Sequence, residues 1–326
     1  MKKRIILGII ISIFFLYLVL RNIDFKSIID VISNGNYLWI LPTIITCTLG
    51  FIFRSVRWRY LLLPVKKFHW RQLFSSLVMG FAANYIFPLR FGEVVRAYIV
   101  GKKHQISKSA SFATIVLERI MDGLGILILL CLSVPFLPVF PPWIKHTILI
   151  AIVLFLVVFV VLTVLILKKH FVDHLKKIPF IKYELKERIV NKIKKFIVGF
   201  EIIKDIKNFS VVLLFSICVW VFETLNLFFL VRIVDIHIPF SGLIFILFIC
   251  VLGIIIPAAP GSIGTFEAAF VVGIMFFSTK VTVITKETAF ATALIAHSIG
   301  GFYVMSLGLY YFFKEGISYK EISESR

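Results

Sequence analysis

Long apolar runs recur along the chain and predict helices that cross a membrane. A helix needs about 20 apolar residues to cross the roughly 30 Å of hydrocarbon in a bilayer. A membrane β-barrel is excluded, because its strands are segments of about ten residues with alternating polarity, whereas these runs are continuously apolar. The runs cover residues 5–20, 39–53, 115–136, 144–167, 211–231 and 289–313.

Two further apolar stretches are interrupted in the middle and predict broken helices. Residues 73–100 break at Phe87-Pro-Leu-Arg-Phe-Gly92, and residues 241–277 break at Pro257-Ala-Ala-Pro-Gly-Ser-Ile-Gly264. Proline and glycine free backbone groups, which membrane proteins tolerate only where protein or water satisfies them. We therefore expect an all-α transmembrane bundle of about six to eight spans. The first broken stretch is a re-entrant hairpin, and the second is a hairpin or two short spans.

The two breaks resemble each other in sequence. In each, a glycine lies four residues after a proline, and a glutamate follows one or three residues later. Interrupted helices at corresponding places in two halves of a chain mark the substrate site of many transporters. The pattern favours an internal repeat, and a chance match of so short a pattern stays open. The matching residues are Pro88, Gly92 and Glu93, and Pro260, Gly264 and Glu267.

Composition and charge place the chain in the membrane. Of 326 residues, 60% are hydrophobic and 16% are charged, which excludes a soluble enzyme. The net charge of +19 argues for contact with anionic lipid and against nucleic acid, because the basic residues lie in short segments between apolar runs. Residues 1–326 are expected to form a single transmembrane domain.

The basic segments also predict the orientation. Residues 54–71 hold six Lys and Arg, and residues 168–207 hold twelve against five acids. Segments rich in Lys and Arg stay on the cytoplasmic side, so both termini are expected there. No small-residue cleavage site follows the first run, which indicates an uncleaved first helix. The localisation expected is a multi-pass protein of a prokaryotic cell membrane.

The segment 168–208 has a helical pattern of its own. Apolar residues recur every three or four positions and basic residues occupy the other faces, which predicts an amphipathic helix on an anionic lipid surface. A solvated basic connector is the alternative, and the segment is too short for a catalytic domain. The apolar positions are Leu185, Ile189, Ile193, Phe196, Phe200 and Ile203.

Ionisable residues inside predicted spans are candidates for a substrate site, because they are costly in lipid. Arg90 and Arg96 at the first break could hold a phosphate group, with Glu93 pairing with either. The alternative is an internal ion-pair network that fixes the hairpin. After the second break, free N–H groups at a helix start could bind an anion.

The next span carries Glu118, Arg119 and Asp122, and positions 118 and 122 share one helical face. These acids could pair with the arginines of the first break or neutralise their neighbours. A lone histidine such as His297 is more often a packing group than a proton relay. The candidate substrate-binding residues are Asn84, Pro88, Arg90, Gly92, Glu93, Arg96, Glu118, Arg119, Asp122, Pro260, Gly261, Gly264 and Glu267, with Glu223 and His297 as further candidates.

Catalytic machinery is not indicated. There is no Gly-rich phosphate loop and no nucleophile beside a base. The four cysteines are isolated within apolar segments, so we expect no disulfide, metal or cofactor. They are Cys47, Cys131, Cys218 and Cys250.

Four motifs resemble the lysylphosphatidylglycerol synthase/flippase transmembrane-domain family, also called the flippase-like domain family. The resemblance covers nearly the whole chain and implies a membrane domain that moves an anionic or aminoacylated phospholipid, or a polyprenyl-linked lipid, between leaflets. In multiple peptide resistance proteins this domain precedes a cytoplasmic aminoacyl transferase, which we do not expect in this chain. The motifs are Arg57-Trp-Arg59, Pro88-Leu-Arg-Phe-Gly-Glu-Val-Val-Arg96, Glu118-Arg-Ile-Met-Asp122 and Pro260-Gly-Ser-Ile-Gly-Thr-Phe-Glu267.

Three functions therefore stay open. The leading hypothesis is a lipid flippase, in which Arg90→Ala impairs transport more than Arg57→Ala does. The second is an enzyme of lipid modification and cationic-peptide resistance, of the phosphatidylglycerol lysyltransferase type. The third is a membrane scaffold that does not transport and that partners a separate synthase. A homo-oligomer is also open.

Overall fold

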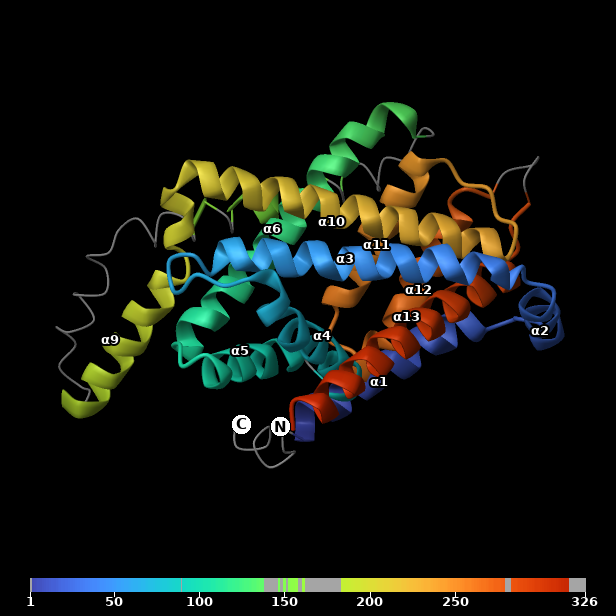
Figure 1. Cartoon of the computed structure of the whole chain (residues 1–326). Helices are drawn as coiled ribbons and strands as arrows, with labels where there is room; N and C mark the ends of the chain where they lie inside the picture. The colour runs from blue at the N-terminus through green and yellow to red at the C-terminus, as the bar shows by residue number, and fades with distance from the viewer. Residues whose placement is uncertain are drawn as a thin grey trace.

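The computed structural model confirms an all-α protein (Figure 1). None of the described residues forms a strand. Side chains are described for the same residues as the backbone, apart from 2–5, 183–186, 188 and 189. The described residues are 2–88, 90–137, 146, 149–150, 152–157, 160–161, 183–278 and 283–316.

Among the described residues, three helical segments are long and apolar enough to cross a membrane. They are Tyr37–Leu61, which joins the short 3₁₀ helix η1 (Tyr37–Trp39) to α3 (Ile40–Leu61), then α10 (Ile206–Ile233) and α13 (Lys286–Lys314). A fourth span is formed if α1 (Lys2–Leu20) and α2 (Phe25–Ser33), which meet at 87°, count together. These helices confirm a helical membrane bundle.

Other predicted spans are not long helices that are apolar throughout. The helix α6 (Lys108–Ser133) covers the apolar run at 115–136 and carries charged residues in its middle. The helix α11 (Phe240–Ile255) has 16 residues, so it is short for a span. The run 144–167 falls largely outside the described residues. Two short 3₁₀ helices flank the longer ones: η2 (Val134–Phe136) follows α6, and η4 (Glu201–Lys204) directly precedes α10.

Both predicted breaks interrupt helices. The helix α4 (Trp70–Ile86) ends before the first break and α5 (Gly92–Lys103) begins after it. At the second break α11 ends, the 3₁₀ helix η5 (Pro260–Ser262) follows, and α12 (Thr265–Met275) begins. Because α4 packs against α5 and α11 packs against α12, each break is the tip of a helical hairpin.

The helices α3 and α10 lie side by side along the molecule and make its most extensive helix contact (Figure 1). Aromatic rings fill this interface: Phe53 lies between Phe215 and Phe222, with ring centroids 5.7 and 4.8 Å away. The helix α6 packs against α10, α11 and α5. This arrangement brings the charged middle of α6 between α3 and the first hairpin.

The two hairpins meet inside the bundle. The helix α4 packs against α13 and against η5 of the second break. The Tyr85 ring of α4 fills the space beside two glycines: a Cβ on Gly301 would lie 3.0 Å from the ring, and one on Gly261 would lie 3.4 Å from it. The second break also rests on α1, because the Ser12 hydroxyl accepts a 2.8 Å hydrogen bond from the Ala259 amide.

Part of the predicted amphipathic segment is helical. The helix α9 (Tyr183–Val198) packs against α6, and the Ser109 hydroxyl donates to the Lys192 carbonyl at 3.0 Å. Val190 and Phe200 are buried, so part of the apolar face lies on protein. Residues 168–182 and the side chain of Ile189 lie outside the described residues, and a lipid-facing role for this segment stays a prediction.

Candidate functional site

A cluster of arginines and carboxylates lies inside the bundle where α3, α5 and α6 meet. Three arginines and three acids from these helices are linked by salt bridges of 2.5–3.5 Å. Buried charges are stable only when they are paired and hydrogen-bonded, so the linkage explains how lipid-embedded helices accommodate them. We call this the charge cluster; its members are Arg57, Glu93, Arg96, Glu118, Arg119 and Asp122.

Glu118 is the centre of the charge cluster. Arg96 donates to both of its carboxylate oxygens, at 3.0 and 2.7 Å, and Arg119 donates to Oε1 at 2.6 Å. The Arg96 guanidinium also lies 3.5 Å from the centre of the Trp58 ring, and the Trp58 indole N–H donates to Thr114 at 3.0 Å. Both terminal nitrogens of Arg96 are therefore occupied by Glu118.

Asp122 lies one turn further along α6 and pairs with Arg57. The distance between Arg57 Nη1 and Asp122 Oδ1 is 2.5 Å, and the same nitrogen donates to the Ser216 hydroxyl of α10 at 3.0 Å. Arg119 Nη1 lies 3.2 Å from the second carboxylate oxygen. Trp220 donates its indole N–H to the Asp122 carbonyl at 2.7 Å. Asp122 thus joins α3, α6 and α10.

A separate ion pair lies beside the charge cluster. Arg54 Nη1 of α3 is 2.7 Å from Glu223 Oε1 of α10, and the Glu223 side chain is 30% exposed. The Phe81 ring of α4 lies between this pair and the charge cluster, since the Arg54 and Arg119 guanidinium carbons are 5.5 and 5.7 Å from its centre. Charged groups therefore continue from the first break towards the α3–α10 interface.

Arg90, in the first break, differs from the other arginines of the site. It is exposed, and its side chain makes no salt bridge or hydrogen bond among the residues that the structure describes, although its carbonyl accepts the Glu93 amide at 3.1 Å. Its φ of +54° lies in the left-handed region, which is costly for a residue with a side chain. Arg119, Glu93 and Asp122 are close enough to interact with it electrostatically.

The structure separates the two arginines that the sequence places together on a phosphate. Arg96 is buried and paired, whereas Arg90 is exposed. Glu93 lies 3.5 Å from Arg119 Nε and pairs with neither Arg90 nor Arg96 in the described structure.

Three residues shape the first break. The Gly92 amide donates to Asn84 Oδ1 at 2.8 Å, which satisfies the first N–H of α5. A Cβ on Gly92 would lie 2.6 Å from that oxygen, so α4 and α5 can approach only because residue 92 is glycine. The Pro88 carbonyl accepts the Phe91 amide at 3.4 Å. These contacts hold the hairpin tip that presents Arg90.

The second break holds its own carboxylate at the start of α12. Glu267 Oε2 accepts the Gly264 amide at 2.6 Å, and Oε1 lies 2.5 Å from His297 Nδ1 of α13. The backbone is left-handed at Gly261 and Gly264, with φ of +71° and +91°. Pro260 begins η5. The helix start predicted to bind an anion therefore carries the Glu267 carboxylate.

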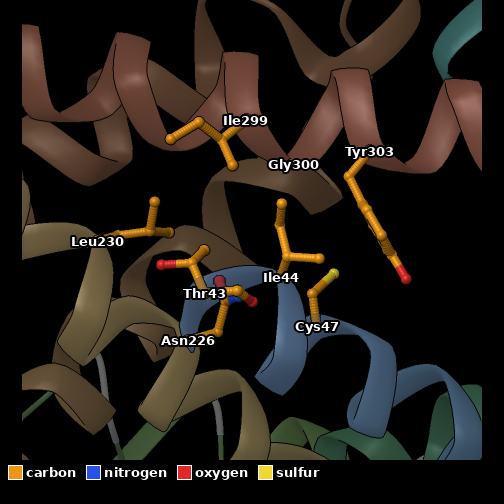
Figure 2. A pocket seen from close by; sticks show the side chains of 8 residues that line it. All are labelled: Thr43, Ile44, Cys47, Asn226, Leu230, Ile299, Gly300 and Tyr303. Carbon is orange, nitrogen blue, oxygen red and sulfur yellow. The ribbon is translucent and has the colours of Figure 1, made fainter. Parts of the chain in front are cut away.

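A small pocket opens between α3, α10 and α13 (Figure 2). Its volume of about 20 Å³ has room for about one water molecule. Asn226, on its wall, donates to the Thr43 carbonyl at 2.9 Å. The pocket is too small for a lipid head group. The lining residues are Thr43, Ile44, Cys47, Asn226, Leu230, Ile299, Gly300 and Tyr303.

Metal ligands are not gathered anywhere in the part of the chain that the structure describes. No three His, Cys, Asp or Glu residues lie close enough together there to hold a metal ion. The four cysteines are free thiols: Cys250 is buried, Cys131 is exposed, and Cys47 and Cys218 are half-buried.

Sequence reasoning missed two members of this region. Arg54 and Arg57 count, in the sequence, towards a basic cytoplasmic segment, yet both lie within α3 and point into the protein. Their spacing of three residues, directly after the apolar run at 39–53, puts them on one helical face. That spacing is the signal that could have revealed them.

These helices and buried charges define an α-helical integral membrane protein with a polar site built into its first hairpin. The chain belongs to the family described as the lysylphosphatidylglycerol synthase TM region, which matches residues 5–308.

Two relatives match shorter segments. One is the UPF0104 membrane protein MJ1595 of Methanocaldococcus jannaschii, 31% identical over 124 residues, or 37% of this chain and 36% of that protein. The other is the glycosyltransferase AglD of Haloferax volcanii, 25% identical over 129 residues, or 38% of this chain and 20% of that protein. The chain thus spans well under two thirds of either relative.

Proposed function

We propose that the protein is a flippase-like transporter that moves a phospholipid, anionic or aminoacylated, or a polyprenyl-linked lipid between leaflets. The observation that carries the proposal is the exposed Arg90 at a helix break beside the charge cluster, whose side chain has no salt bridge within the part of the chain that the structure describes. A charged head group cannot cross hydrocarbon unaided and needs compensating charge along its path. Membership of a membrane lipid-related family supports this function.

In this proposal the head group enters at the first break while its acyl tails stay in the bilayer. Arg90 holds the phosphate by charge-assisted hydrogen bonds, the geometry in which arginine is strongest. Arg119 and then Arg54 offer further positive charge as the head group passes Phe81. The partly exposed Glu93 and Glu223 orient its polar groups.

The proposed setting is the cell membrane of a prokaryote, with both termini in the cytoplasm. The basic segment 168–208 would then face the anionic lipid of the inner leaflet, which attracts clustered Lys and Arg. In this proposal the first break, and Arg90, would lie within the membrane region that a head group must cross.

Lipid movement by the purified full chain in proteoliposomes tests the function. Fluorescent phosphatidylglycerol and its lysyl ester would be followed by quenching from outside, with wild type, Arg90→Ala and Arg71→Ala. Arg71 is an exposed arginine at the start of α4, away from the break. Movement lost only in Arg90→Ala is expected. Absence of movement with every lipid, including a polyprenyl phosphate, would contradict the proposal.

A second candidate is a part in lipid modification, favoured by the names of the family and of the Haloferax relative. The chain would then act as an enzyme or hold a separate synthase. An assay with aminoacyl-tRNA and phosphatidylglycerol distinguishes the enzyme. Recovery of a stoichiometric synthase with the tagged chain, without lipid movement by the chain alone, would favour the scaffold.

A further inference from the structure

We infer that the site selects lipids whose head group carries a net negative charge on its phosphate, and that it disfavours aminoacylated, cationic head groups. The inference rests on the proposed function, because it assigns the substrate class of the same site. It is carried by the balance of charges around the first break and by the backbone conformation of Arg90.

The arginines and carboxylates of the region match one to one, with a single arginine left over. Arg96 pairs with Glu118, Arg57 with Asp122, Arg119 with Glu93, and Arg54 with Glu223. Each of these carboxylates lies within 3.5 Å of an arginine nitrogen. Among the described residues of the region, Arg90 is the remaining charge, so the site carries one uncompensated positive charge.

The location of that charge fits an approaching ligand. Arg90 is exposed at the hairpin tip, while Glu118 and Arg57 are fully buried. A ligand phosphate can reach the Arg90 guanidinium without breaking an existing salt bridge. It would complete the pairing of the whole site, and in a region of low dielectric such pairing is worth more than in water.

The backbone gives an independent reason to assign Arg90 to a ligand. The left-handed region is sterically unfavourable for an L-residue with a side chain, a cost that glycine avoids. Arg90 has this conformation with φ of +54°, and its side chain gains no hydrogen bond or salt bridge among the described residues in return. Strained backbone of this kind concentrates at functional sites.

A cationic head group would find no unpaired carboxylate among the described residues of the site. The lysyl ester of phosphatidylglycerol adds two ammonium groups to one phosphate, so its net charge is positive. Its ammonium groups would need a carboxylate of their own, and each carboxylate of the region already lies within 3.5 Å of an arginine nitrogen. Binding it would require a salt bridge to open, which costs affinity.

Lipid binding, measured separately from transport, tests the inference. The purified full chain in detergent would be titrated with fluorescent phosphatidylglycerol, its lysyl ester and phosphatidylcholine, with wild type, Arg90→Gln, Arg90→Glu and the control Arg71→Glu. Wild type should prefer phosphatidylglycerol over the lysyl ester by about tenfold, because both lipids offer a phosphate to Arg90 and only the lysyl ester brings ammonium groups to a site with an uncompensated positive charge. Arg90→Gln should remove the preference and Arg90→Glu should reverse it, while Arg71→Glu leaves it unchanged.

The outcomes separate the inference from the proposed function. Equal binding of both lipids by wild type, or a preference unchanged in folded Arg90→Glu, overturns the inference even if lipid movement is observed. A reversed preference without movement in proteoliposomes supports the inference and rejects transport. Glycerol phosphate serves as the soluble competitor. If it fails to displace the lipid, the result supports a lipid as the ligand. If it binds with the same affinity as the lipid, the inference that the site selects lipids is overturned.

Discussion

Arg57 is a fully buried residue that anchors three helices. It reaches Asp122 and Glu118 of α6 and Ser216 of α10 from its position in α3. Removing one partner of a buried ion pair leaves an uncompensated charge, which typically costs about 3–5 kcal/mol. We expect Arg57→Ala to lower the thermal unfolding temperature strongly, measured by intrinsic fluorescence in detergent.

The control for this variant is Arg59→Ala. Arg59 lies two residues further along α3, is half-buried and rests on the Tyr60 ring. Its loss should change stability by about 0.5 kcal/mol or less. Equal destabilisation by both variants would show that the charge cluster does not hold the helices. Lipid movement by Arg57→Ala and Arg90→Ala must accordingly be compared per folded molecule.

Arg90 should behave in the opposite way. Arg90→Gly removes the charge and relieves the strained left-handed backbone, and the folded state loses no side-chain hydrogen bond or salt bridge of the described residues. The expected result is an unfolding temperature equal to or above that of wild type, together with loss of phosphatidylglycerol movement. A clear fall in stability would instead assign Arg90 a structural role.

At the residue scale the sequence predicted some of the ion pairs that the structure shows and missed others. Arg96 and Glu118 stand out because charges within apolar runs are rare, and the structure pairs them. The sequence could not tell that Glu118 occupies Arg96 completely and leaves Arg90 alone. That distinction depends on the rotation of α5 against α6, which no local pattern encodes.

The first hairpin depends on close contact between α4 and α5 at Gly92. A Cβ there would lie 2.6 Å from Asn84 Oδ1 and 2.8 Å from the Asn84 amide nitrogen. Gly92→Ala should therefore destabilise the protein by about 1–3 kcal/mol, as overpacking does. In Gly300→Ala, the new methyl group would meet only the Tyr85 hydroxyl, at 4.0 Å, and it serves as the control. Equal unfolding temperatures of the two variants would contradict this account.

The start of α10 gives a pH-dependent prediction. The Asp205 carboxylate accepts two hydrogen bonds from Asn208, one from its side-chain NH₂ at 2.6 Å and one from its backbone N–H at 3.1 Å. These bonds lower the Asp205 pKa below its usual 3.8. The charged form is favoured in the folded state, so its stabilisation is full above pH 3.8 and is lost as pH falls through the lowered pKa. Asp205→Ala should lower the unfolding temperature at pH 7 and have less effect at pH 3.

The matched control is Asp30→Ala. Asp30 is an exposed aspartate in α2 whose carboxylate makes no hydrogen bond within the described residues. Its loss should change the unfolding temperature little at either pH. An Asp205→Ala effect that is the same at pH 7 and pH 3 would exclude the charged cap as its cause.

Sequence patterns located both helix breaks, but they did not locate every helix. Proline and glycine interrupt apolar runs at both hairpins, and the helices end there. The short helix α2 was not predicted, because it lacks a long apolar run. It forms through its Asp24 cap, which accepts from the Lys26 and Ser27 amides at 3.1 and 3.2 Å. Caps of this kind are weak signals beside hydrophobic length.

The whole molecule is expected to keep both ends on one side of the membrane. The sequence of the segment 168–207 holds twelve Lys and Arg against five acids, whereas Arg54 and Arg57 are internal and do not contribute to orientation. Epitope tags at residues 1 and 326 should both be protected from protease in intact cells and cleaved after permeabilisation. Opposite accessibility of the two tags would refute the orientation.

The contact of Tyr85 with the second hairpin constrains how this protein can be engineered or can evolve. The Tyr85 ring on α4 fills space that Gly261 and Gly301 leave open, and its centre lies 5.9 Å from that of the His297 ring, with the two ring planes tilted. A first hairpin grafted from a distant homologue would leave a void or a collision there unless the glycines changed with it. Residues 85, 261 and 301 should therefore be inherited and exchanged as one unit, although more than 170 positions separate the first of them from the second.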